Sequence, residues 1–293
     1  MQRLLIVDGH AYAYRAFHAI RSLRGPAGQP TNAIYGFVKM LEKLRLALKP
    51  AGLVVAWDGG LSAARVESLP EYKSHRPEMP EDLRVQLDEL VSYLAAAGVA
   101  SYCGEGIEAD DYIACLARRA ADAGWSVVIA CSDKDFMQLV SPRIGLWNPN
   151  DKSAKIWTCE EVRVKAGVEP EQVEGWLAMM GDAVDNIPGV RGVGPKTAAE
   201  LLREFGSVRA LFERLGEVKS ERVRAALAES ADVVRRNLDL VRLHEVPCEF
   251  VPEQVALRPA RVEELRGLYR RWGFKGMIES LDRQMSGQQA ELI

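Results

Sequence analysis

The sequence predicts an α/β protein in which helices cover both faces of a mainly parallel central sheet, followed by a smaller helical subdomain. Three short apolar runs, residues 3–7, 53–57 and 126–130, indicate strands that are buried on both faces. Segments with helical periodicity separate these runs, which is typical of parallel strands joined by crossover helices. We therefore expect an α/β core over residues 1–160 and a helical subdomain over residues 161–293.

The helices expected in the core follow the strand candidates. Residues 12–20 and 31–48 carry helical patterns, and Thr31 or Asn32 is a suitable N-cap for the second. Residues 113–121 follow an acidic stretch, which suits a helix N-terminus because of the helix dipole. In the second half, helical patterns cover residues 159–166, 173–180, 196–204, 208–214, 220–229 and 262–272.

Residues 59–82 interrupt this alternation of strands and helices. They contain three prolines, few large apolar residues and charges of both signs. Such a composition does not supply a core strand, so we expect an excursion that faces solvent. It is either an ordinary surface loop or a segment that folds around a ligand.

The composition is that of a globular enzyme, with 293 residues of which 48% are hydrophobic and 27% are charged. No apolar run approaches the roughly 18 residues of a membrane helix, and the N-terminal apolar stretch is too short for a signal peptide. The five cysteines are widely spaced without a C-x-x-C pair, which favours a reduced, cytoplasmic protein without a zinc ribbon. The net charge of −3 does not by itself indicate a nucleic-acid partner.

Acidic residues follow the ends of all three strand candidates, at Asp8, Asp58 and Asp133. The carboxyl ends of parallel strands lie at one edge of a sheet, where ligands bind. One aspartate in a turn would carry little weight, because Asp is a common turn residue. Three at three strand ends predict a shared site.

Further carboxylates occur in dense groups that a small site cannot hold as bare anions, so protons or cations must compensate them. A helix N-terminus needs one or two acids, whereas the stretch before residue 112 holds four. An all-oxygen set without His or Cys favours Mg²⁺ or Mn²⁺ over zinc, and no EF-hand loop is present for calcium. Such ions commonly serve phosphate chemistry. The groups are Glu105, Glu108, Asp110 and Asp111; Asp133 and Asp135; and Asp182 and Asp185.

A second motif, GVRGVGPKTA, covers residues 189–198. Closely spaced glycines before a helix allow backbone N–H groups to approach a phosphate. The Walker A motif requires a lysine directly after its last glycine, and Pro195 intervenes here, so that motif is absent. The stretch is either a hairpin between two helices that grips a nucleic-acid backbone without reading its sequence, or a plain turn.

Together these residues resemble the 5′-nuclease superfamily, and most closely its bacterial 5′→3′ exonucleases. The resemblance extends from residue 4 to about residue 281 and implies a PIN-like nuclease core, a helical arch at about residues 59–82 and a helix–hairpin–helix element at about residues 176–205. The chain departs from the usual pattern at Ala183, Val184 and Pro195. The motifs that carry the resemblance are the Trp57-Asp58 strand end and LLIVDGHAYAYRAFHA, EYKSHRPEMPEDL, GIEADDYIACLA, SDKDFMQLV and GDAVDNIPGVRGVGPKTA.

The resemblance also implies the residues of the site. Lys73 and Arg76 would neutralise the scissile phosphate. Setting the nine metal-binding acids aside leaves 32 acidic against 38 basic residues, a net charge of +6 that suits a polyanionic substrate. The main-chain carbonyls of the hairpin would also hold a K⁺. The implied ligands of two or more Mg²⁺ or Mn²⁺ ions are Asp8, Asp58, Glu108, Asp110, Asp111, Asp133, Asp135, Asp182 and Asp185, and the implied DNA contacts are Arg65, Tyr72, Gly192, Gly194, Lys196 and Thr197.

The implied function is that of a structure-selective 5′ nuclease in DNA replication and repair. Its partners would be DNA with 5′ flaps, nicks, gaps or free 5′ ends, and we expect a cytoplasmic monomer with no membrane partner. Two other hypotheses remain. A catalytically silent DNA-binding module would gain nothing from an anionic pit, and an aspartate-based phosphatase would need a second Asp where this chain has His10.

Overall fold

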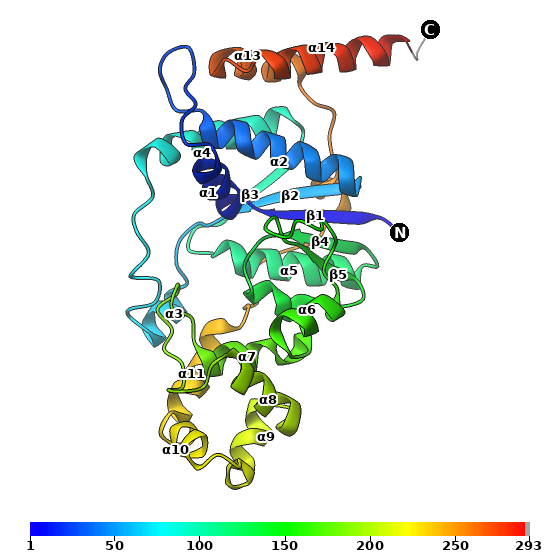
Figure 1. Cartoon of the computed structure of the whole chain (residues 1–293). Coiled ribbons are helices and arrows are strands. Elements are labelled where there is room, and N and C mark those ends of the chain that lie inside the picture. Colours follow the sequence, from blue (N-terminus) through cyan, green and yellow to red (C-terminus); the bar gives the residue numbers. More distant parts are fainter. Residues whose placement is uncertain (291–293) are drawn as a thin grey trace. The chain divides into compact units, whose positions relative to one another are not determined.

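A computed structural model describes residues 1–290 of the chain, whose strands form a five-stranded, mainly parallel sheet in the order β3-β2-β1-β4-β5. The three predicted apolar runs coincide with β1, β2 and β4, and the predicted fold class is confirmed. The sequence analysis did not assign β3, whose positions alternate between half-buried and exposed, or β5, which has four residues. The strands are β1 (Arg3–Asp8), β2 (Gly52–Trp57), β3 (Ala100–Cys103), β4 (Ser126–Ala130) and β5 (Ile144–Trp147) (Figure 1).

The chain forms two compact units, each built from several stretches of sequence. One unit comprises residues 2–57, residues 78–102 and the chain from Phe250 onward. The other comprises residues 58–77 and 103–249 together with Met1. The units are thus interleaved along the sequence.

In the first of these units, β1 and β2 pair in parallel, with Leu4 opposite Gly52. Buried Gln86 of α4 holds the beginning of α2, because its Oε1 accepts hydrogen bonds from the backbone N–H groups of Ala33 (2.9 Å) and Ile34 (3.2 Å). Thr31 is the N-cap, as predicted, but its side chain makes no capping bond. The helices are α1 (Gly9–Ala19), α2 (Asn32–Leu48), α4 (Glu81–Ala96), α12 (Pro252–Val255), α13 (Val262–Trp272) and α14 (Lys275–Ala290).

In the second unit, β4 and β5 pair in parallel with Val127 opposite Ile144. The apolar helix α7 packs against α8 and α11 and buries Leu177 and Met179. The helices are α3 (Ala63–Ser68), α5 (Ala109–Asp122), α6 (Cys159–Ala166), α7 (Val173–Met180), α8 (Pro195–Phe205), α9 (Val208–Glu213), α10 (Glu221–Glu229) and α11 (Ala231–Val241).

The segment around α3 differs from the expectation that it faces solvent. Its side chains Arg65, Leu69, Tyr72 and Lys73 are all buried. That expectation was wrong for these residues because their partners are far away in sequence, where composition does not reveal them. Within residues 1–290, none of the helices has the length and apolar character needed to cross a membrane.

Candidate active site

Asp58 ties the end of β2 to the beginning of α5. Its Oδ1 accepts a hydrogen bond of 2.8 Å from the backbone N–H of Ala109, the first residue of the helix. Gly59 permits this arrangement, because a Cβ at that position would lie 1.7 Å from the carbonyl oxygen of Gly104. The turn after β2 therefore requires glycine, and its aspartate is held beside the acidic N-terminus of α5.

Glu108, the N-cap of α5, is buried among cations and donors. Its Oε1 accepts from the backbone N–H of Ser62 at 3.0 Å and lies 3.2 Å from Arg65 Nη1. Its Oε2 accepts from the hydroxyl of Tyr72 at 3.1 Å and from Lys73 Nζ. Burial opposes ionisation, but Lys73 and Arg65 outweigh it and hold the pKa of Glu108 below its usual value. Glu108 is therefore an anion with its charge already compensated.

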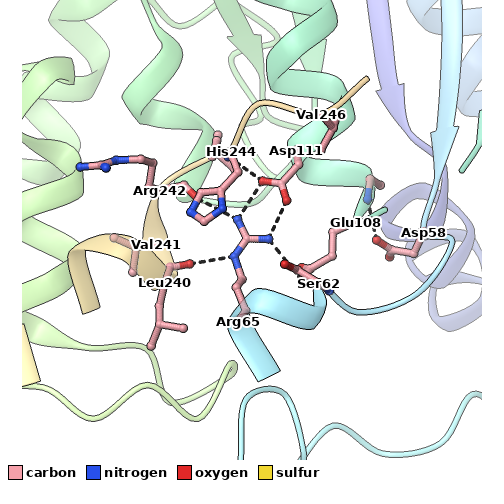
Figure 2. Close-up of polar contacts among 12 residues, drawn as sticks. Asp58, Ser62, Arg65, Glu108, Asp111, Leu240, Val241, Arg242, His244 and Val246 are labelled. Carbon is pink, nitrogen blue, oxygen red and sulfur yellow. Dashed lines mark hydrogen bonds and ion pairs between the residues drawn. The ribbon is translucent and has the colours of Figure 1, made fainter. Parts of the chain in front are cut away.

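Each of the three side-chain nitrogens of Arg65 donates a hydrogen bond to another part of the protein (Figure 2). Nε donates to the carbonyl of Leu240 at 3.0 Å and Nη2 to that of Arg242 at 2.7 Å. Nη1 and Nη2 donate to the two carboxylate oxygens of Asp111 at 2.7 and 2.8 Å. With a side chain only 4% exposed and every nitrogen bonded within the protein, Arg65 holds a structural position, and its predicted contact with DNA stays a prediction.

Asp111 likewise uses its side chain for contacts within the protein. Its Oδ1 also accepts from the backbone N–H of His244 at 2.8 Å, so both oxygens are used by the protein. Protein donors thus occupy Asp111 in this structure, and its predicted binding of a metal ion stays a prediction. The neighbouring Asp110 is half-buried, and its charge is among those that raise the pKa values of Lys73 and Arg76.

A second group of carboxylates lies after β4 and after α7. Asp133 Oδ1 accepts from the backbone N–H of Asp135 at 2.9 Å, while Asp135 Oδ1 is buried and without a hydrogen-bond partner among the described residues. Burial raises the pKa values of both residues. The charges of Asp182 and Asp185 act on both and raise these pKa values further. These two loops thus hold carboxylates whose charge the protein compensates only in part.

Two partly exposed cations face this group. Lys134 Nζ donates to Asp182 at 2.8 Å and Arg76 Nη2 to Asp185 at 2.5 Å. Their side chains are 34% and 44% exposed, whereas that of Lys73 is 5% exposed. Lys134 and Arg76 therefore have room to turn toward solvent, and Lys73 does not.

The carboxylate oxygens of this site have the chemistry of ligands for a divalent ion. As they stand, no three His, Cys, Asp or Glu side chains among residues 1–290 are grouped to hold a metal ion. Side-chain cations compensate much of the acidic charge, for which the sequence predicted protons or cations, with Mg²⁺ or Mn²⁺ favoured. The unpartnered buried oxygen of Asp135 and the all-oxygen set around it fit Mg²⁺ or Mn²⁺ once Lys134 and Arg76 withdraw.

The basic turn that carries Lys73 and Arg76 is fastened to the loop that carries Asp182 and Asp185. The backbone N–H of Lys73 donates to the carbonyl of Asp185 at 3.0 Å, and Asn186 Nδ2 donates to the carbonyl of Glu71 at 3.0 Å. Lys73 and Asn186 both have left-handed backbones, with φ of 56° and 58°. Asn186 was not among the predicted site residues, although Asn is one of the few residues that adopt this conformation readily.

The predicted helix–hairpin–helix corresponds to α7, the loop from Gly181 to Gly194, and α8. Buried Ile187, Val190 and Val193 anchor the loop, while its turn at residues 191–192 is exposed. Trp176 Nε1 donates to the carbonyl of Pro195 at 2.9 Å. Pro195 occupies the first position of α8, where its missing N–H costs no helical bond.

The predicted DNA contacts of this element lie on or beside that turn. Gly192 and Lys196 are exposed, and Gly194 and Thr197 are half-buried. Asp8 belongs to the other compact unit, where it ends β1 and caps α1 by accepting from the backbone N–H of Ala11 at 2.9 Å. Its participation in the metal site remains a prediction.

The chain matches known families over most of its length. Residues 3–167 match the 5′-3′ exonuclease N-terminal resolvase-like domain, and residues 168–263 match the 5′-3′ exonuclease C-terminal SAM fold. The chain belongs to the 5′-3′ exonuclease family.

Family members of different length resemble the chain. It is 35% identical to a 5′-3′ exonuclease of Aquifex aeolicus over 97% of this chain and 96% of that protein. It is 38% identical to DNA polymerase I of Pseudomonas aeruginosa over 96% of this chain, but it spans only 31% of that protein. A structure of the T5 D15 protein co-crystallised with metal ions is 26% identical, with a TM-score of 0.69 over 83% of this chain and 90% of that one.

Proposed function

We propose that this 5′-3′ exonuclease family member is a structure-selective nuclease that hydrolyses DNA phosphodiesters at or near 5′ ends. It would act as both a 5′→3′ exonuclease and a 5′-flap endonuclease, using two Mg²⁺ or Mn²⁺ ions. The observation that carries the proposal is the group of four carboxylates around Asp135, which includes a buried oxygen without a partner and faces two cations that can move. Family membership and the metal ions in the T5 D15 structure support it.

The carboxylates would hold the ions in two sets. Asp133, Asp135, Asp182 and Asp185 form the set with uncompensated charge. Asp58 and Asp110, at the N-terminus of α5, with Asp8, are the proposed second set, and Glu108 would add its negative charge to the set while its oxygens stay bonded to Arg65, Tyr72 and Lys73. When bound, the ions supply Lewis-acid stabilisation of the attacking and leaving oxygens of an in-line displacement.

Lys73 is the proposed electrostatic partner of the scissile phosphate. Burial lowers its pKa, but Glu108, Asp110 and Asp185 outweigh that effect, so the pKa lies above its usual value and the ammonium group stays charged. A fixed cation in a buried site stabilises developing negative charge without first reorganising. Arg76, which is more exposed, would follow the phosphate as the substrate enters.

The hairpin would bind the duplex beside the cut. The exposed turn at residues 191–192 and the first turn of α8 present backbone N–H groups and Lys196 to a phosphate backbone. A structure of the bacteriophage T5 D15 flap endonuclease contains DNA and metal ions, and its similarity of fold agrees with a DNA substrate here. We propose that the chain acts as a cytoplasmic monomer in replication and repair, with K⁺ bound at the hairpin.

The test is cleavage of labelled 5′-flap, nicked, gapped and blunt duplexes with Mg²⁺, with Mn²⁺ and with a chelator. We expect cleavage at 5′ ends or junctions only when a divalent ion is present. Asp133→Asn should abolish cleavage while leaving DNA affinity nearly unchanged. Intact substrates in every metal condition would refute the nuclease and leave a DNA-binding module, which needs no metal.

A further inference from the structure

We propose that Arg65 is a positioning residue for the N-terminus of α5 and that Asp111 is its counter-ion, so that Asp111 does not bind a metal ion. The inference deepens the proposed function and rests on it, because it specifies which carboxylates at the beginning of α5 would serve the metal ions. Sequence reasoning had given Asp111 to a metal and Arg65 to DNA. Their contacts give both residues a different role.

Arg65 joins three segments that are distant in sequence. It projects from α3 and contacts Asp111 in the first turn of α5 and the carbonyls of Leu240 and Arg242, at and just beyond the end of α11 (Figure 2). The backbone N–H of His244 completes the arrangement by donating to Asp111. A single guanidinium therefore fixes where α5 begins.

The direction of the helix follows from this contact. Residues 108, 110 and 111 belong to the same turn, so anchoring Asp111 sets the orientation in which Glu108 and Asp110 leave that turn. Arg65 Nη1 also lies 3.2 Å from Glu108 Oε1. The planar fork of the guanidinium matches a carboxylate at two points, which Lys cannot do.

Burial makes the ion pair permanent. The side chains of Arg65 and Asp111 are each 4% exposed, so neither charge reaches water if the pair separates. A metal at Asp111 would take from buried Arg65 the carboxylate that accepts two of its hydrogen bonds, with Glu108 as the remaining counter-ion. Lys134 and Arg76 differ in this respect, because they are about a third or more exposed and can release their carboxylates.

Metal binding without DNA is the direct test. Electron paramagnetic resonance counts free and bound Mn²⁺ for the full chain and for the adjacent variants Asp110→Asn and Asp111→Asn. We expect Asp110→Asn to weaken Mn²⁺ binding by roughly 10-fold or more, and Asp111→Asn to bind the same number of ions as the wild type. Loss of a bound ion in Asp111→Asn, or Mn²⁺ binding weaker than that of Arg65→Gln, would overturn the inference.

Stability provides the coupling test. Asp111→Asn and Arg65→Gln should each lower Tm by roughly 10 °C, and the double variant should lose clearly less than the two losses combined, because it removes both buried charges. Additive losses would overturn the pairing. Arg65→Gln should also weaken Mn²⁺ binding by about 10-fold through misplaced Glu108 and Asp110, and unchanged affinity would overturn the positioning role.

The wild-type chain tests the pair even if a variant fails to fold. Hydrogen exchange at the Nη–H groups of ¹⁵N-labelled arginine, which donate to Asp111, should stay slow for Arg65 with and without saturating Mg²⁺. Fast exchange on adding Mg²⁺ would mean that the metal has taken Asp111. A wild type that binds no Mn²⁺ would instead refute the proposed function, while the stability coupling would still decide the role of Arg65.

Discussion

Asp135 shows how a single residue can favour function over stability. Its carboxylate is placed where burial and the neighbouring Asp133 both disfavour its charge, and one of its oxygens has no hydrogen-bond partner in the described chain. A residue under no functional demand would not be kept in this state, because an unpaired buried polar group destabilises the fold. A bound divalent ion removes the conflict.

The raised pKa values of Asp133 and Asp135 predict how stability depends on pH. A carboxyl group whose folded pKa exceeds its unfolded value takes up a proton on folding, so its contribution falls as pH rises from about 4 through the raised pKa. We therefore expect Mg²⁺ to raise Tm more at about pH 8 than at about pH 5. Thermal unfolding at both pH values, with and without Mg²⁺, measures this.

Asp135→Asn is the matched variant for the pH experiment. Because the amide carries no charge, the metal-free variant should be more stable than the metal-free wild type at about pH 8, by about 1 kcal/mol or more. Its Tm should respond little to Mg²⁺, and it should not cleave DNA. A variant that is less stable than the wild type without metal would contradict this account of the site.

Lys73 is the residue for which we expect the largest effect on turnover among the cations. Lys73→Ala should lower the single-turnover rate on a 5′ flap by roughly 10²-fold, as expected for the loss of one preorganised charge. Circular dichroism should show a folded protein. Lys152→Ala, at an exposed lysine in the same compact unit, should cleave at the wild-type rate.

For single residues, the sequence predicted which acidic side chains gather in one site better than it predicted which side chains contact one another. The acids stand in local motifs, so their gathering around Asp135 could be anticipated from strand ends and spacing. The role of Arg65 could not, because its partner Asp111 is 46 residues away and its carbonyl partners begin 175 residues away. A guanidinium in a proline-containing, polar stretch is typical of a surface, and only the tertiary fold shows that it is buried.

At the scale of elements, the basic turn and the loop between α7 and α8 form one working part. Their two backbone-mediated contacts, from Lys73 to Asp185 and from Asn186 to Glu71, set the distance between phosphate-binding cations and metal-binding carboxylates. Lys73 and Asn186 both have a left-handed backbone where they make these contacts, a conformation that costs free energy for residues other than glycine. The contact could not be predicted from local sequence, since each of its two segments has the composition of an ordinary loop.

Asn186→Ala tests this coupling between the two elements. The change removes the bond to Glu71 and puts a residue that disfavours positive φ at this position, so we expect turnover to fall by about 10-fold with little change in DNA affinity. Asn186→Gly is the control, because it loses the same side-chain bond but accepts the backbone conformation. It should retain more activity than Asn186→Ala, and the reverse order would show that the backbone conformation is unimportant.

The elements that the sequence left unassigned share a physical cause. β3 has no continuous apolar run because its exposed positions alternate with half-buried ones, and α3 has six residues in a stretch rich in breakers. β1, β2 and β4 were found because burial on both faces imposes an unbroken apolar run. Local pattern thus identifies the centre of the sheet, whereas its edges and the segment around α3 depend on tertiary contacts.

At the scale of the whole molecule, the net charge of −3 is the sum of an acidic proposed site and a remainder with more basic than acidic residues. Nine of the 41 acidic residues were predicted to bind metal ions, and without them the chain has 32 acidic and 38 basic residues. Counter-ions bound to DNA are released when such basic groups meet phosphates, so affinity should fall steeply with salt. The same salt should affect the chemical step less, because Lys73 is buried and screened little.

Lys196→Ala tests whether a basic residue outside the acidic site contributes to DNA binding and not to the chemical step. Lys196 is exposed in the first turn of α8, so its loss should weaken binding to flapped duplexes of any sequence and reduce the slope of log Kd against log salt by about 1. Fluorescence anisotropy over a salt series measures the slope, and single-turnover rates at saturating enzyme should match the wild type. Lys219→Ala, an exposed lysine before α10, reports the effect of removing a charge outside the hairpin. Since saturating enzyme compensates for weaker binding but not for slower chemistry, a reduced single-turnover rate in Lys196→Ala would place this lysine in the reaction itself, and an unchanged slope would remove it from the DNA-binding surface.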